Sequence, residues 1–295
     1  MKPVQGRREF LQIAAAGAAT ALAGSPALGL ERGGGREAKA EVLSAPPVAG
    51  RGEPKFELGL ASYTLRKFDL AKTIELTKRV GLKHIALKDM HLPLTSSRDQ
   101  IQAAAAQVKE ASLDLYGCGV VYMKNEDEVS RAFEYAKAAG MRVIIGVPQY
   151  ELLPLVDKMV REYDIKLAIH NHGPGDETYP LPSTAYEKIK DLDKRIGLCN
   201  DIGHTIRAGM DPAASILEFG DRLHDVHIKD VSAADPSGVE IEIGRGVIDI
   251  PNVMRALIEI NYAGIVSFEY EKDADDPVPG LAESVGYARG VLATL

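Results

Sequence analysis

The second half of the chain contains four strand-like segments in which metal-binding side chains recur near the carboxyl end. The segments are 166–172 (KLAIHNH), 196–201 (IGLCND), 223–229 (LHDVHIK) and 265–271 (IVSFEYE). Successive side chains of a strand point to opposite faces, so each segment has one apolar face and one polar face. We predict that the polar faces line a shared interior with a metal-binding cluster at its open end, formed by His170, Asp201, His227 and Glu269.

Two imidazoles and two carboxylates form a ligand set for one divalent transition metal. The mixed nitrogen and oxygen donors suit Mn, Co, Fe, Ni or Zn better than Mg or Ca, and they leave positions for water or substrate. A single histidine at a strand end is more often a hydrogen-bonded core residue, and an ion pair with Lys229 or Arg245 would account for Glu269 alone. Four such residues on four successive strands favour a metal site.

Bringing these residues together requires a regular succession of strands and helices. After Pro54 the sequence alternates between the two eight times. The predicted strands cover 57–63, 83–88, 113–118, 142–147, 166–172, 196–201, 223–229 and 264–270, and the predicted helices cover 69–80, 97–111, 125–139, 150–162, 183–193, 211–220, 251–260 and 281–293. This pattern predicts a single-domain (β/α)8 TIM barrel, in which chemistry occurs at the carboxyl ends of the strands. A doubly wound sheet is the alternative, but no Gly-rich dinucleotide turn follows the first strand.

The N-terminal segment has the features of an export signal. Arg7 and Arg8 precede a short Ala-rich apolar stretch over 13–23, which is too short for a stable membrane anchor. We interpret residues 1–30 as a twin-arginine signal peptide, with a plain secretory signal or a hydrophobic helix as the alternative. Residues 31–54 are interpreted as a flexible linker and 55–295 as the barrel. The protein is then expected in the periplasm or outside the cell.

The composition is ordinary for a soluble globular protein. The chain has 295 residues, of which 45% are hydrophobic and 26% charged. A formal net charge of −7 argues against a general nucleic-acid or anionic-membrane surface. The two cysteines, Cys118 and Cys199, are interpreted as buried free thiols. A monomer and a homo-oligomer are both compatible with this composition.

Five motifs carry a resemblance to a known family. They are 169–173 (IHNHG), 200–204 (NDIGH), 225–230 (DVHIKD), 244–246 (GRG) and 267–270 (SFEY). In this order they resemble the xylose isomerase-like sugar phosphate isomerase/epimerase family, over about residues 56–295. In the ketose 3-epimerases of that family the metal ligands are Glu, Asp, His and Glu. The resemblance therefore implies that Asp201, His227 and Glu269 are ligands, whereas His170 stands where the first Glu is expected.

The resemblance also implies contacts with a small-molecule sugar substrate. His204 matches a substrate-binding histidine, and Asp176 stands where the family has a Glu. Ala233 stands where the family has an Arg, and Lys229 is a candidate replacement or a structural partner of the acids. His172 shares a face with His170 and is the alternative ligand or a substrate contact.

Two further segments have open roles. Lys88 follows the second strand together with Asp89 and His91, and this segment either contacts substrate or is a solvated loop. The motif 244–246 either lines the site or binds an anion, although a lone GRG is a weak signal.

The activity implied by the resemblance is that of a metal-dependent isomerase or epimerase. It would act on a non-phosphorylated sugar or keto-sugar through an enediolate, with Glu269 as the base and His204 steadying or protonating an oxygen. An imidazole at position 170 removes one of two proton-moving carboxylates. This departure raises the alternative of a lyase or hydratase that acts on 3-keto-glycosides. A metal-dependent hydrolase and a non-catalytic sugar-binding protein are further alternatives.

Overall fold

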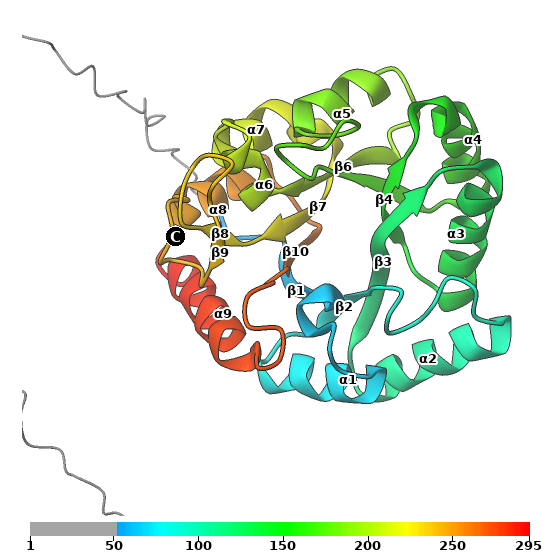
Figure 1. The fold of residues 1–295 in the computed structure, drawn as a ribbon, viewed down its shortest axis with the longest axis horizontal. Helices are drawn as coiled ribbons and strands as arrows, with labels where there is room; N and C mark the ends of the chain where they lie inside the picture. Colours follow the sequence, from blue (N-terminus) through cyan, green and yellow to red (C-terminus); the bar gives the residue numbers. More distant parts are fainter. Residues whose placement is uncertain (1–51) are drawn as a thin grey trace, which may run out of the picture. The chain divides into compact units, whose positions relative to one another are not determined.

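The computed structural model describes residues 52–295, which form a closed barrel of eight parallel strands inside a ring of helices (Figure 1). The barrel strands are β1 (Glu57–Ala61), β2 (His84–Leu87), β3 (Asp114–Met123), β4 (Val143–Pro148), β5 (Lys166–His170), β6 (Ile196–Asp201), β7 (Leu223–Ile228) and β10 (Ile265–Phe268). Their order around the barrel is β1-β10-β7-β6-β5-β4-β3-β2. All neighbouring pairs are parallel, so the carboxyl ends of the strands meet at one rim. The predicted TIM barrel is confirmed.

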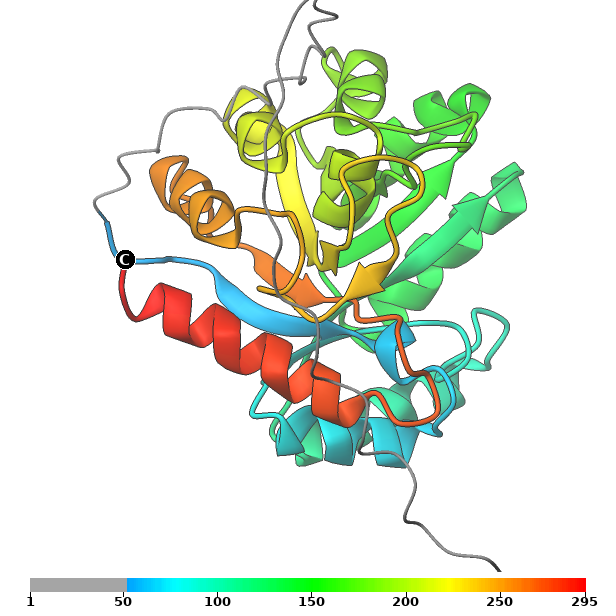
Figure 2. The same cartoon turned by 60° about the vertical axis from the view of Figure 1, so that its left-hand side comes forward.

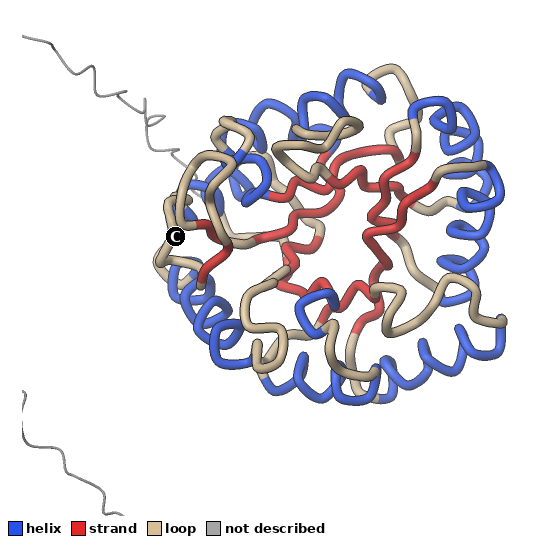
Figure 3. Tube along the Cα trace, in the orientation of Figure 1, coloured by secondary structure: helices blue, strands red, loops and turns tan. Residues whose placement is uncertain are grey.

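Figure 3 shows the strands enclosed by the helices. The helices are α1 (Leu70–Arg79), α2 (Arg98–Glu110), α3 (Glu126–Ala139), α4 (Leu153–Tyr163), α5 (Pro182–Ile189), α6 (Ile202–Arg207), α7 (Pro212–Phe219), α8 (Ile250–Glu259) and α9 (Val278–Leu292), with 3-10 turns at Ser62–Leu65, Tyr150–Leu152 and Gly220–Arg222. Asp69 and Asp211 begin helices as predicted, because each side chain accepts a hydrogen bond from a backbone N–H of the first turn.

The helix ring closes where α9 meets the end of α1 (Figure 2). Arg289 of α9 donates a hydrogen bond of 2.6 Å to the carbonyl of Gly81. Gly81 has a φ of +79°, and a Cβ there would lie 2.9 Å from the Arg289 guanidinium. The backbone conformation therefore favours glycine at this position, whereas the flexible Arg289 side chain could shift away from an added Cβ.

The predicted signal peptide (1–30) and most of the predicted linker (31–54) lie outside the described residues, and both stay predictions. Within residues 52–295, no helix has the length and apolar character needed to cross a membrane.

Three elements differ from the prediction near the rim. Strand β3 continues to Met123 through a register shift between Cys118 and Val121, whereas the prediction ended at 118. Strand β5 ends at His170 rather than at 172, and the following turn includes Gly173 at a φ of +77°. The short helix α6 was not predicted, because six residues are too few to show a helical period.

A short ribbon, β8 (Asp230–Val231) with β9 (Glu240–Ile241), also lies outside the predicted pattern. The buried carboxylate of Asp230 holds the segment that follows it. Its Oδ2 accepts hydrogen bonds of 2.9 Å from the N–H groups of Gly244 and Gly246. The GRG motif therefore surrounds a carboxylate of this chain, and Arg245 pairs with Glu283 at 2.6 Å.

Candidate metal centre

Four of the predicted site residues converge at the carboxyl rim of the barrel. His170 ends β5, Asp201 ends β6, His227 lies in β7 and Glu269 directly follows β10. One ligand atom from each lies within 4.8 Å of the others, and all four residues are buried. Strand register accounts for this meeting, because His227 pairs with Asp201 on β6 and with the residue two before Glu269 on β10.

The spacing of the ligand atoms fits one divalent ion. His170 Nε2 lies 3.1 Å from His227 Nδ1, and His227 Nδ1 lies 3.0 Å from Glu269 Oε2. His170 Nε2 lies 3.4 Å from Asp201 Oδ2. Ligands held about 2.1 Å from a metal ion are themselves roughly 3.0 to 3.4 Å apart. His170 Nε2 and Glu269 Oε2 are 3.8 Å apart. The donor set and its spacing could therefore hold a divalent metal ion.

The two carboxylate oxygens of Asp201 have different surroundings. Oδ1 accepts the backbone N–H of His204 at 2.8 Å and so begins α6. Oδ2 is fully buried and makes no aligned hydrogen bond with the described residues. This oxygen instead lies 3.0 Å from Lys229 Nζ and 3.4 Å from His170 Nε2, so it faces the cluster and is available as a metal ligand.

A buried lysine neutralises part of the acidic charge. Lys229 Nζ lies 3.0 Å from Asp201 Oδ2, 2.9 Å from Glu269 Oε2 and 2.7 Å from Glu271 Oε1. Burial by itself would raise the pKa of the Asp201 and Glu269 carboxyls, but the nearby cations hold both pKa values well below their usual range. Burial would likewise lower the pKa of Lys229, but the carboxylates raise it well above its usual value. Both acids are therefore ionised.

Each of the two imidazoles of the cluster contacts the other cluster residues through one ring nitrogen. Burial would lower the pKa of His170, but the Asp201 and Glu269 carboxylates outweigh it and raise that pKa to about 9. The other ring nitrogens, His170 Nδ1 and His227 Nε2, are buried and lack a hydrogen-bond partner among the described residues. No second partner therefore fixes the tautomer of either ring.

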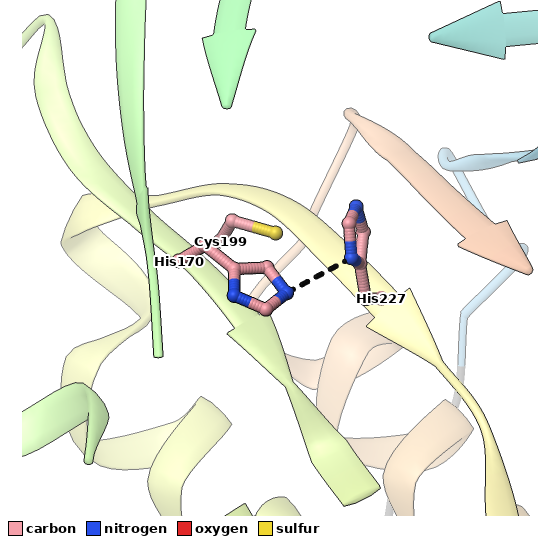
Figure 4. A group of neighbouring side chains, drawn as sticks. All are labelled: His170, Cys199 and His227. Carbon is pink, nitrogen blue, oxygen red and sulfur yellow. Dashed lines mark hydrogen bonds between the residues drawn. The ribbon is translucent and has the colours of Figure 1, made fainter. Parts of the chain in front are cut away.

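A second group of possible ligands places Cys199 beside the two imidazoles (Figure 4). The Cys199 Sγ lies 4.0 Å from Asp225 Oδ1. Burial, followed by the charges of Asp225 and Asp201, raises the pKa of this thiol well above its usual value. A ligating sulfur is a thiolate, so the surrounding carboxylates favour the set with Asp201 and Glu269. Cys118 and Cys199 are both buried free thiols, as predicted.

His172 lies at the mouth, outside both groups of possible ligands. Its Nε2 lies 2.9 Å from the Tyr122 hydroxyl, and its Nδ1 lies 3.3 Å from Asp176 Oδ2 without the alignment of a hydrogen bond. Its ring centroid is 4.4 Å from that of His170. Burial, then the charges of His170 and His204, lowers its pKa to about 3. The imidazole is thus neutral and faces the space above the cluster.

The remaining predicted contacts line the same mouth. The His204 ring on α6 lies 6.0 Å from the His170 ring, and burial lowers the pKa of His204. Lys88 Nζ donates to the Val120 carbonyl at 2.5 Å and lies 5.8 Å from the Tyr122 ring centre. His91 is not solvated, because it is buried between the Ser62 hydroxyl and the Leu65 carbonyl.

Tyr122 is the mouth residue that the sequence analysis missed. It is half exposed and lies on the extension of β3 beyond residue 118. Burial, then the charges of Asp176 and Glu269, raises its pKa. The run from Val120 to Met123 was a signal for a longer strand, but the preceding glycines made the segment resemble a turn.

Comparison with known proteins agrees with this geometry. The profile of the xylose isomerase-like TIM barrel family matches residues 64–291, so the chain belongs to this family. An inosose dehydratase of Geobacillus kaustophilus is 26% identical over 152 residues, which are 44% of this chain and 45% of the relative. The chain thus matches less than half the length of this relative.

Solved structures share the fold at low sequence identity. The IolI protein with a bound zinc atom has a TM-score of 0.69 and 18% identity, over 81% of this chain and 99% of that protein. The 3-keto-D-glucoside 4-epimerase YcjR of E. coli has a TM-score of 0.66 and 16% identity, over 80% of this chain and all of that protein. At these identities the likeness is one of fold.

Proposed function

We propose that the chain is a metal-dependent isomerase or epimerase that acts on a non-phosphorylated sugar or keto-sugar through an enediolate. The observation that carries this proposal is the convergence of His170, Asp201, His227 and Glu269 within 4.8 Å at the carboxyl rim of a TIM barrel. The zinc atom of the IolI structure and the sugar epimerase YcjR, both of the same fold, support it.

The four residues would hold one divalent ion of Mn, Co, Fe, Ni or Zn. Such an ion supplies Lewis acidity, which acidifies a C–H next to a carbonyl of the substrate. Glu269 then takes the proton. Its described polar contacts all use Oε2, so Oε1 is the oxygen that acts as base.

The mouth residues would bind and orient the sugar. His204 and His172 are neutral imidazoles at the mouth, able to donate one hydrogen bond and accept another. Tyr122 stacks on His172, Lys88 lies over the Tyr122 ring, and Asp176 Oδ2 is 3.3 Å from His172 Nδ1. Lys229 is 3% exposed and contacts three carboxylates, so it does not face the substrate directly.

A lyase or dehydratase that acts on 3-keto-glycosides is the second candidate. It is favoured by His170, which occupies the position of a carboxylate ligand in the ketose 3-epimerases that the chain resembles. A single base that removes the proton, with a leaving group on the next carbon, gives elimination rather than epimerisation. The similarity to inosose dehydratase agrees with this outcome.

We also propose that Arg7 and Arg8 direct export by the twin-arginine route. Sugar phosphates are mostly cytoplasmic, so an exported enzyme is expected to act on a sugar without phosphate.

The first prediction concerns the proton transfer. The metal-loaded protein should exchange a substrate C–H for deuterium in D2O, measured by NMR with ketohexoses, inososes and 3-keto-glucosides. An isomeric product indicates epimerisation, and an unsaturated keto-sugar indicates elimination. Glu269→Gln should reduce the exchange rate by about a hundredfold or more, and Glu283→Gln, an exposed acid on α9, is the matched control. Metal binding without exchange on any of these sugars would contradict the proposal.

A further inference from the structure

Lys229 is a buried cation in the middle of the proposed metal centre. Its side chain is 3% exposed, and its ammonium group contacts Asp201, Glu269 and Glu271. A buried lysine is costly unless it is paired with opposite charge. These three acids provide that charge.

The ammonium group uses the same oxygens that a metal ion would use. Asp201 Oδ2 lies 3.0 Å from Lys229 Nζ and 3.4 Å from His170 Nε2. Glu269 Oε2 lies 2.9 Å from Lys229 Nζ and 3.0 Å from His227 Nδ1. Asp201 Oδ1 is occupied by the N–H of His204. A divalent ion that binds through Asp201 Oδ2 and Glu269 Oε2 would therefore share both oxygens with the ammonium group.

The fold makes room for the lysine stem at this depth. Gly203 of α6 lies against it, and a Cβ at Gly203 would be 2.5 Å from Lys229 Cγ and 2.7 Å from Cδ. The contact with Glu271 points outward, because that carboxylate is 36% exposed whereas Asp201 is fully buried. The ammonium group thus already has an acceptor on the solvent side, which it can keep when it leaves Asp201 and Glu269.

We propose that Lys229 is a tethered cation that competes with the divalent ion for Asp201 and Glu269 and so sets the metal affinity of the site. In the metal-free protein the ammonium group neutralises the two carboxylates. Metal binding displaces it toward Glu271. The inference rests on the metal centre of the proposed function. It assigns to Lys229 two effects, a weaker affinity for the metal and a more stable fold without it.

The second prediction tests this competition by titrating the metal-stripped, full-length protein with Mn²⁺ in a calorimeter. Lys229→Met keeps the stem and removes the charge, so it should bind Mn²⁺ about tenfold or more tightly than the wild type. Its melting temperature without metal should fall, and the rise on adding Mn²⁺ should be larger. Lys272→Met is the matched control, because Lys272 pairs with Glu242 at 2.7 Å outside the cluster, and it should leave the Mn²⁺ affinity unchanged.

Two further variants keep the test decisive. Gly203→Ala crowds the lysine stem without removing its charge and should also tighten Mn²⁺ binding, which provides a second test if Lys229→Met does not fold. His227→Ala should abolish the binding and thereby locate it. Equal or weaker Mn²⁺ binding by both Lys229→Met and Gly203→Ala would overturn the inference and leave the metal centre standing. No Mn²⁺ binding by any of these proteins would overturn the metal centre itself.

Discussion

The barrel interior contains two polar layers, which lie two residues apart on the same strands. Their carboxyl groups differ in ionisation state. The rim layer contains Asp201, His227 and Glu269. The layer beneath it contains Cys199, Asp225 and Ser267, with Tyr116 of β3 hydrogen bonded to Ser267. Both layers are buried. The carboxyls of the rim layer are ionised, whereas burial raises the pKa of Asp225 in the lower layer to about 7.

The difference shows that neighbouring charge, rather than depth, decides the state of a buried acid. Asp201 and Asp225 are both 0% exposed. Asp201 has the Lys229 ammonium at 3.0 Å. Asp225 has a thiol at 4.0 Å, and its Oδ2 lacks a hydrogen-bond partner among the described residues. The charge of His227 also acts on Asp225, but it lowers the Asp225 pKa less than burial raises it. The Lys229 ammonium group lies in the rim layer. Only this layer therefore combines ionised carboxylates with a cation that a metal ion could displace.

The third prediction concerns the lower layer. The Asp225 pKa is near 7 in the folded chain and ordinarily about 3.9 in an unfolded one. Folding therefore favours the protonated form of Asp225. The free energy of unfolding is highest at low pH, where Asp225 is protonated in both states, and it falls as the pH rises toward 7. Asp225→Asn cannot ionise, so its stability relative to the wild type should rise by about 3 kcal/mol between pH 4 and pH 7.

Urea unfolding in EDTA across that pH range provides the measurement. Asp211→Asn is the matched control, because Asp211 begins α7 through an exposed hydrogen bond that Asn can also make. Its curve should run parallel to that of the wild type. A parallel curve for Asp225→Asn as well would show that the lower layer is charged like the rim.

The fourth prediction has the smallest expected effect and separates the two possible ligand groups. Cys199 belongs to the lower layer, although its sulfur lies near His170 and His227 (Figure 4). Cys199→Ala should change the Mn²⁺ and Zn²⁺ affinities by about twofold or less. Its free energy of unfolding should decrease modestly because a buried sulfur is lost. A hundredfold loss of Zn²⁺ affinity would instead make Cys199 a ligand.

Much of the rim was predictable from sequence because it follows from strand periodicity. Alternation along β5, β6 and β7 places His170, Asp201 and His227 on one inward face, and parallel pairing brings the strand ends to one rim. These regularities require no knowledge of particular side-chain contacts. The same reasoning predicted the barrel itself, since eight β–α units have few other arrangements.

The rest depended on contacts between segments that are distant in sequence. The sequence left Lys229 as either a substitute for an arginine that binds substrate or a structural partner of Glu269 or Glu271. The structure pairs it with both of these acids and also with Asp201, and Gly203 leaves room for its stem. Tyr122 was missed because two glycines interrupt the pattern of β3. Asp230 was not connected with the GRG motif, since that contact joins residues 14 or more positions apart. No periodicity encodes such pairings.

The fifth prediction addresses the central claim most directly, through the anomalous scattering of crystals grown with Mn²⁺. One anomalous peak should lie about 2.1 Å from four atoms, which are His170 Nε2, Asp201 Oδ2, His227 Nδ1 and Glu269 Oε2. Lys229 should have moved away from Asp201 in the same map. A peak bound by His172 or Cys199 in place of His170, or no peak among these residues at saturating Mn²⁺, would contradict the account.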